Sequence, residues 1–146
     1  MSYSAGEALL LTRVQACTGF SSTNTARAKW GLLDSGASDH YAILKAGRTD
    51  ITWITLKDYQ VTYRTIVQVW QRYVDDGVTS TNLYGYVANL FAILSYPHLA
   101  GGLVDSTIES ISEVQERWKA GSDGPQWLMQ EIEVSWVEQT EVSFAE

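Results

Sequence analysis

Residues 58–73 read DYQVTYRTIVQVWQRY, and this stretch decides the class of fold. Apolar and β-branched residues recur at every second position, which is the period of a β-strand. One strand face would carry Val61, Tyr63, Thr65, Val67 and Val69, and the other would carry Thr62, Arg64, Ile66, Gln68 and Trp70. The pattern therefore predicts one long strand, and one of its faces is clearly more apolar than the other.

A second long strand is expected over residues 126–142. Its alternation would place Leu128, Ile132, Val134 and Trp136 on one face, and Trp127, Met129, Glu131, Glu133 and Ser135 on the other. Shorter strands are expected over residues 41–44 and 51–56, which are rich in apolar, β-branched and aromatic residues. Residues 107–118 alternate unevenly, and we expect a further strand there.

Two segments show helical spacing instead. Residues 4–17 begin with Ser4 and have Glu7 three positions later, which is the pattern of a capping box. Residues 80–95 repeat large apolar side chains every three or four positions. The order of elements predicts one α+β domain over residues 1–146, with a mostly antiparallel sheet and two main helices packed on one face.

Polar stretches separate these elements. Residues 20–29 are rich in Ser, Thr and Asn, and they predict a loop or a short helical turn. Residues 34–39 predict an extended surface loop, and residues 75–77 (Asp-Asp-Gly) predict a turn.

Charge and composition narrow the classes of function. Ten basic residues stand against 17 acidic ones, so the formal net charge is −7. Attraction to nucleic acid or to an anionic membrane by bulk charge is therefore disfavoured. No apolar run approaches the roughly 20 residues that span a bilayer, and the first residues do not resemble a signal peptide. We expect a soluble, intracellular protein, in which the single cysteine, Cys17, forms no intramolecular disulfide.

The sequence carries no recognisable catalytic or cofactor motif. His40, His98 and Cys17 are far apart in the sequence, whereas a zinc site takes three or four ligands at short spacings. No glycine-rich phosphate-binding pattern occurs. Glu131 and Glu133 would lie about 7 Å apart on one strand face, which is compatible with a glycosidase pair but is far more often a solvated surface. We predict no enzyme activity, no metal and no cofactor.

Aromatic residues and charge distribution suggest an assembly component. Six Trp and eight Tyr exceed what one core of this size requires. Trp30, Trp53 and Trp127 fall beside loops or on the more polar strand faces, where they would serve either an interface or the edge of the chain's own core. Basic residues cluster in the first third and acidic residues in the last third, which suits a head-to-tail contact between identical subunits or two ordinary solvated faces.

The order of these segments resembles the tail terminator (tail completion) proteins of long-tailed bacteriophages. The resemblance covers most of the chain, and its motifs are diffuse. It rests on the amphipathic opening helix and on four further stretches: residues 24–36 (NTARAKWGLLDSG), 41–47 (YAILKAG), 69–73 (VWQRY) and 132–138 (IEVSWVE).

This resemblance implies a structural, non-enzymatic virion protein of the tail and neck that is assembled in the host cytoplasm. Members of the family form a hexameric ring on the head-proximal end of the tail tube, end its polymerisation and join the tail to the head-closure protein at the portal. The genome passes through the ring without specific binding. An acidic lumen would suit that passage because like charges repel, which makes Glu131 and Glu133, or the Asp75-Asp76 turn, candidates for lining it.

Two polar loops are candidates for contacts with neighbouring subunits or with the tube, although both would also suit simple solvent loops. They span residues 33–40, with Asp34, Asp39 and His40, and residues 75–79, with Asp75 and Asp76.

Three alternatives stay open. The nearest is another neck or tail component, including the tail tube subunit, which would polymerise openly instead of closing as one ring. A portal-adjacent adaptor fits less well, because that class is mainly helical. A small-molecule binding module or an enzyme could use a pocket lined by Trp.

Overall fold

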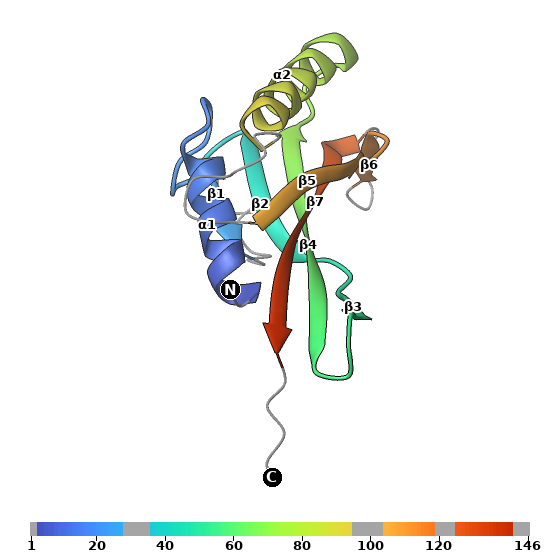
Figure 1. Cartoon of the computed structure of the whole chain (residues 1–146). Coiled ribbons are helices and arrows are strands. Elements are labelled where there is room, and N and C mark those ends of the chain that lie inside the picture. The colour runs from blue at the N-terminus through green and yellow to red at the C-terminus, as the bar shows by residue number, and fades with distance from the viewer. Residues whose placement is uncertain (1–2, 28–35, 95–103, 119–124, 142–146) are drawn as a thin grey trace.

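The computed structural model describes residues 3–27, 36–94, 104–118 and 125–141, and within them the chain forms two helices and seven strands (Figure 1). The helices are α1 (Tyr3–Gln15) and α2 (Asp76–Leu94). The strands are β1 (Thr25–Arg27), β2 (His40–Ala46), β3 (Asp50–Trp53), β4 (Asp58–Arg72), β5 (Val104–Ile111), β6 (Gln115–Trp118) and β7 (Pro125–Glu141). Neither of these two helices is long and apolar enough to cross a lipid bilayer.

The two long strands β4 and β7 form the centre of the sheet. They pair antiparallel along the whole of β4, from Asp58 opposite Glu141 to Arg72 opposite Trp127. β2 and β3 pair with the other edge of β4, and β5 and β6 pair with the other edge of β7, all antiparallel. Among the described strands, only β1 and β2 pair in parallel. The prediction of an α+β fold with a mostly antiparallel sheet is confirmed.

Both helices pack on one face of this sheet, as predicted. Leu10 and Val14 of α1 and Leu83 and Leu90 of α2 have no exposed surface, because they pack against the alternate side chains of three strands. Those strand residues are Ala42, Leu44, Val67, Val69, Leu128, Ile132, Val134 and Trp136. Residues paired across strands share a face. The more apolar sides of β4 and β7 therefore meet in one core.

A second, smaller cluster is buried on the opposite face of the sheet. It contains Tyr41, Ile43, Trp70, Trp127 and Met129. The indole rings of Trp70 and Trp127 meet edge to face, with their centroids 6.5 Å apart. Trp127 is only 4% exposed. Of the two roles considered for it, an interface or the chain's own core, the structure places it in the core. Trp30, the other aromatic residue beside a predicted loop, lies outside the described residues.

The predictions for residues 20–29 and 107–118 need correction. The loop or helical turn expected over residues 20–29 is wrong for residues 25–27, which form β1. Three residues are too few to show an alternating pattern, and β1 depends on its long-range pairing with β2. The single strand expected over residues 107–118 is divided, because the chain leaves the ladder after Ile111 and pairs again with β7 from Gln115.

Two further boundaries also moved. α2 begins at Asp76, four residues before the expected start, so the predicted turn at residues 75–77 includes the first turn of the helix. The loop expected to reach His40 ends at Asp39, because His40 is the first residue of β2 and pairs with Gln71.

Candidate functional site

Glu131 and Glu133 lie on the sheet face opposite both described helices. They point to the same side of β7, as the two-residue period predicts, because their partners on β4 are Gln68 and Ile66. Further polar side chains join them there. We call this surface the acidic face, and we define it by Asp50, Arg64, Gln68, Glu109, Glu131 and Glu133.

Arg64 is the centre of the acidic face. Its Nη1 lies 2.6 Å from Oδ2 of Asp50, and its Nε lies 2.7 Å from Oε2 of Glu109 and 4.0 Å from Oε1 of Glu133. The Arg64 side chain is only 11% exposed, so these pairs are shielded from water more than ordinary surface pairs. Arg48 adds a second guanidinium, 3.3 Å from the carboxylate of Asp50. One cation therefore connects acidic side chains from three strands.

Crowding of acids around Arg64 perturbs two of them in opposite directions. The pKa of Glu133 is raised, first by partial burial and then by the hydrogen bond and the negative charge of Glu109. The pKa of Glu109 is lowered, chiefly because Arg64 donates a hydrogen bond to its carboxylate. Arg64 is closer to Glu109 than to Glu133, which explains why Glu109 holds its charge more firmly.

Glu131 is held by different partners. Nε2 of Gln68 donates a hydrogen bond of 2.9 Å to its carboxylate. Ser112 fixes the backbone of Glu131 with two hydrogen bonds. The Ser112 hydroxyl accepts the N–H of Glu131 at 2.9 Å, and the N–H of Ser112 donates to the Glu131 carbonyl at 2.8 Å. Both predicted acids therefore have ordered positions on the acidic face.

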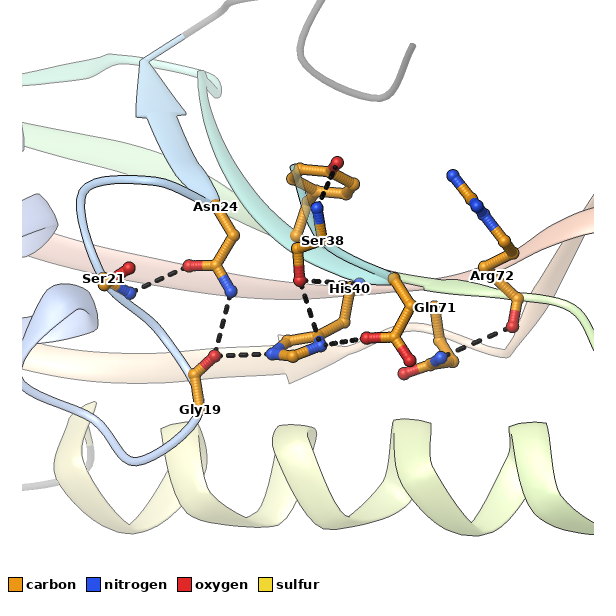
Figure 2. Close-up of polar contacts among 9 residues, drawn as sticks. Gly19, Ser21, Asn24, Ser38, His40, Gln71 and Arg72 are labelled. Carbon is orange, nitrogen blue, oxygen red and sulfur yellow. Dashed lines mark hydrogen bonds and ion pairs between the residues drawn. The ribbon is translucent and has the colours of Figure 1, made fainter. Parts of the chain in front are cut away.

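The candidate contact residue His40 is engaged inside the fold (Figure 2). Its Nδ1 lies 2.7 Å from Oδ1 of Asp39, and its Nε2 faces the carbonyl oxygen of Gly19. Its ring stacks on Tyr86 of α2, with the centroids 4.1 Å apart, and meets Phe20 edge to face at 5.5 Å. His40 thus connects the loop after α1, the start of β2 and the middle of α2. Because its ring is used inside the fold, we do not include His40 among the proposed contacts with other subunits.

Gly19 makes this arrangement of His40 possible. Its φ of +97° is disfavoured for residues with a side chain, and a Cβ there would come within 2.7 Å of the Tyr86 ring. The side-chain amide of Asn24 also donates to the Gly19 carbonyl, at 2.9 Å, and accepts the Ser21 N–H at 2.8 Å (Figure 2). The loop after α1 is therefore shaped around one carbonyl group.

The other predicted contact residues have different surroundings. Asp39 is exposed, and its pKa is lowered chiefly by the hydrogen bond with His40. Its carbonyl accepts the N–H of Arg72 at 2.8 Å, which ties the loop to the end of β4. Asp34 lies outside the described residues.

Asp75 and Asp76 start helix α2. Oδ1 of Asp75 accepts the N–H of Val78 at 2.8 Å, so Asp75 is the N-cap of the helix. The Thr79 hydroxyl accepts the N–H of Val74 at 2.9 Å. Oδ1 of Asp76 accepts a hydrogen bond from the Tyr73 hydroxyl. Both carboxylates are exposed, but each accepts a hydrogen bond that stabilises the start of α2. Among the described residues, no hydrogen bond or ion pair connects Asp75 or Asp76 with Glu131 or Glu133.

Two features were missed in the sequence. Residues 54–56 are wrong as the end of the strand predicted over residues 51–56, because β3 ends at Trp53 and the chain turns back to β4 with Ile54 and Leu56 exposed. The only sequence signal was an apolar run without alternation. A shallow depression between α1 and α2 was also missed, because it depends on how the helices pack.

The described residues include no group of three or more His, Cys, Asp or Glu side chains arranged to hold a metal ion. The chain matches no protein-family model and no curated protein.

Proposed function

We propose that this chain is a structural protein of a long-tailed bacteriophage, a tail terminator that forms a ring on the head-proximal end of the tail tube. In that role it would end polymerisation of the tube and join the tail to the head-closure protein. The proposal starts from the resemblance of the sequence. The observation that carries it further is the two-sided sheet, with helices on one face and ordered acids on the other.

A two-sided sheet suits the wall of a ring around DNA. The acidic face would line the lumen. Its ion pairs join three carboxylates, those of Asp50, Glu109 and Glu133, to the guanidinium groups of Arg64 and the neighbouring Arg48. A fourth carboxylate, that of Glu131, is bonded only to the side-chain amide of Gln68 in these contacts. Around Arg64, this local excess of negative charge would repel the nearby phosphates of the passing genome. The helices would lie on the outer side, where α1 and α2 cover the main core.

Capping of tail tubes tests the proposal. The purified chain is added to tail tube subunits during their polymerisation, and tube lengths are measured by negative-stain electron microscopy. A terminator should bind one end of each tube and stop growth there. Tubes that keep growing, with no density of this chain at their ends, would contradict the proposal.

The same samples separate the alternatives. A tail tube subunit would add along the tube or form open tubes without help. A small-molecule binding module was expected to use a pocket lined by Trp, but the depression of about 290 Å³ between the helices has no Trp in its lining. Such a module would show a ligand-dependent rise in melting temperature.

A further inference from the structure

The hairpin formed by β3, β4 and the turn between them exposes several large apolar side chains. In Figure 1 this hairpin lies at the end of the molecule away from α2. Four of its residues are mostly exposed, and we call them the apolar tip: Ile51 at 61%, Trp53 at 59%, Ile54 at 52% and Leu56 at 91%. Exposed apolar clusters of this kind mark interaction sites on soluble proteins.

The hairpin is held in one shape by its own hydrogen bonds. The Thr55 hydroxyl accepts the N–H groups of Lys57 and Asp58, at 3.2 and 2.9 Å, and donates to the Asp58 carboxylate at 3.1 Å. Trp53 packs on Tyr59 across the hairpin, with the ring centroids 5.1 Å apart. An ordered surface loses less conformational entropy when it binds. The apolar tip is therefore preorganised for a contact.

A shallow depression of about 290 Å³ lies between the end of α1 and the last turns of α2. We call it the helix groove, and its lining residues are Ala16, Cys17, Thr18, Asn89, Ala92 and Ile93. An engineered cavity of about 150 Å³ holds a benzene ring. The helix groove is thus large enough to receive one aromatic or branched side chain.

The helix groove has the same chemistry as the apolar tip. None of its lining residues is charged, and residues 77–94 of the sequence contain no Asp, Glu, Lys or Arg. A surface helix usually carries charged side chains on its outward face, so this outward face of α2 is suited to burial. Copies of a chain with a net charge of −7 repel one another. Contact between two uncharged surfaces minimises that repulsion.

We propose that the apolar tip of one subunit docks into the helix groove of the next copy of this chain, with Leu56 as the side chain that enters the groove. The β3–β4 hairpin and helix α2 lie at opposite ends of the molecule (Figure 1). The contact therefore joins two different surfaces and is heterologous. Heterologous contacts generate rings when the rotation between subunits closes. In a closed ring every tip and every groove is occupied. The inference rests on the proposed function, which requires a ring, and it names the contact that builds that ring.

Substitutions on each side test the contact by analytical ultracentrifugation. Leu56→Asp places a charge on the apolar tip, and Asn89→Lys places one in the helix groove. Both side chains are exposed, so both variants should keep the wild-type circular dichroism and melting temperature. Each should weaken self-association about 100-fold, because burial of a Leu-sized side chain is lost and a charge must be desolvated. Val74→Asp is the matched control, since Val74 is 72% exposed but lies in neither surface, and it should associate like the wild type.

Mixing the two variants distinguishes this contact from a symmetric one. A Leu56→Asp chain keeps an intact groove, and an Asn89→Lys chain keeps an intact tip. An equal mixture should therefore associate again. The intact tip of the Asn89→Lys chain binds the intact groove of the Leu56→Asp chain, and the Asp at the tip of the Leu56→Asp chain meets the Lys in the groove of the Asn89→Lys chain. A tip-to-tip contact would not recover in this way.

Three results would overturn the proposal. The first is a Leu56→Asp variant that associates like the wild type, and the second is a mixture that stays monomeric. The third is a wild-type chain that stays monomeric at about 1 mM, where a contact with a Kd in that range already populates oligomers. If that monomer floats with phosphatidylcholine vesicles and Leu56→Asp abolishes flotation, the apolar tip binds a lipid surface instead.

Failure of this contact and failure of the proposed function give different results. If Leu56→Asp rings still form and cap tail tubes, the terminator role stands and the contact is wrong. If the wild type forms rings that Leu56→Asp disrupts but these rings do not bind tubes, the contact stands and the terminator role is wrong.

Discussion

At Gly6 the first helix lies directly on the indole of Trp136. A Cβ at this position would come within 2.6 Å of the ring, which is itself only 1% exposed and packs between Tyr3 and Tyr63. The ring has no room to move away, because protein cores are packed as densely as organic crystals. The absence of a side chain at residue 6 therefore sets how closely α1 approaches β7.

Gly6→Ala should destabilise the protein by about 1–3 kcal/mol, because the added methyl group overpacks the core. The free energy of unfolding in urea measures this effect. Gly85→Ala is the matched control: its Cβ meets nothing within 4 Å, so the substitution within α2 should stabilise the protein by about 0.5–1 kcal/mol. A Gly6→Ala variant as stable as the wild type would show that α1 approaches β7 less closely than described.

On the acidic face, Glu133 and Glu109 should affect stability with opposite dependence on pH. The raised pKa of Glu133 means that the folded state binds its proton more tightly than the unfolded state does. Its contribution is therefore favourable at low pH and is lost as the pH rises through the folded-state pKa. Glu133→Gln should be more stable than the wild type at pH 7, and the difference should shrink as the pH falls toward the ordinary pKa of a glutamate.

Glu109→Gln is the opposing control for that experiment. The pKa of Glu109 is lowered by Arg64, so its carboxylate stabilises the fold above the unfolded-state pKa and loses this effect as the pH falls. Glu109→Gln should be less stable than the wild type at pH 7, with a loss that diminishes in acid. Urea unfolding between pH 4 and pH 7 measures both variants. Destabilisation of Glu133→Gln at pH 7 would mean that attraction to Arg64 outweighs burial and repulsion by Glu109.

Among the elements, the two long strands were the most predictable. β4 and β7 each show alternation long enough to be unambiguous, and both were placed within one residue of their observed ends. Their polar sides also placed Glu131 and Glu133 on one face. A strand as short as β1 carries no such pattern, since its position is set by pairing with β2. The side chains that surround Glu133 could not be predicted from the sequence. Arg64 lies on β4 and Glu109 on β5, and both come close to Glu133 only because these strands pair with β7.

The start of α2 shows how a short polar motif can be read in two ways. Asp-Asp-Gly is typical of a turn, yet here the Asp75 carboxylate caps a helix that continues through Gly77. The apolar pattern of the core begins only at Leu83. In the first turn the apolar residue, Val78, is exposed and the buried residue is the polar Thr79, so the sequence carries no core signal there.

Asp75→Ala should lower the free energy of unfolding by about 1 kcal/mol, because the N–H of Val78 loses its side-chain acceptor. Asp75→Asn keeps an oxygen at the same position and should retain most of the stability. Chemical denaturation of both variants checks this expectation. Equal losses for Ala and Asn would indicate that the charge of Asp75, and not its capping hydrogen bond, stabilises α2.

At the scale of the whole molecule, the acidic face is proposed to line a channel for DNA. Neutralising it with the double substitution Glu131→Gln and Glu133→Gln should increase retention of DNA and slow its ejection from particles that carry the variant. The effect should diminish at high salt, which screens repulsion between exposed charges. Glu116→Gln is the control, because Glu116 pairs with Leu128 and so lies on the other side of the sheet. Unchanged ejection in the double variant would remove Glu131 and Glu133 from the lumen.

Closure into a ring is the central claim, since both the terminator role and the tip-to-groove contact depend on it. The most direct measurement is the mass of the purified chain by light scattering, with negative-stain images of the same peak. The account predicts a single species of one size, imaged as closed rings consistent with a hexamer. Open tubes of increasing length would contradict it and would identify a tail tube subunit instead. A monomer that also fails to bind or cap tail tubes would contradict the proposed function altogether.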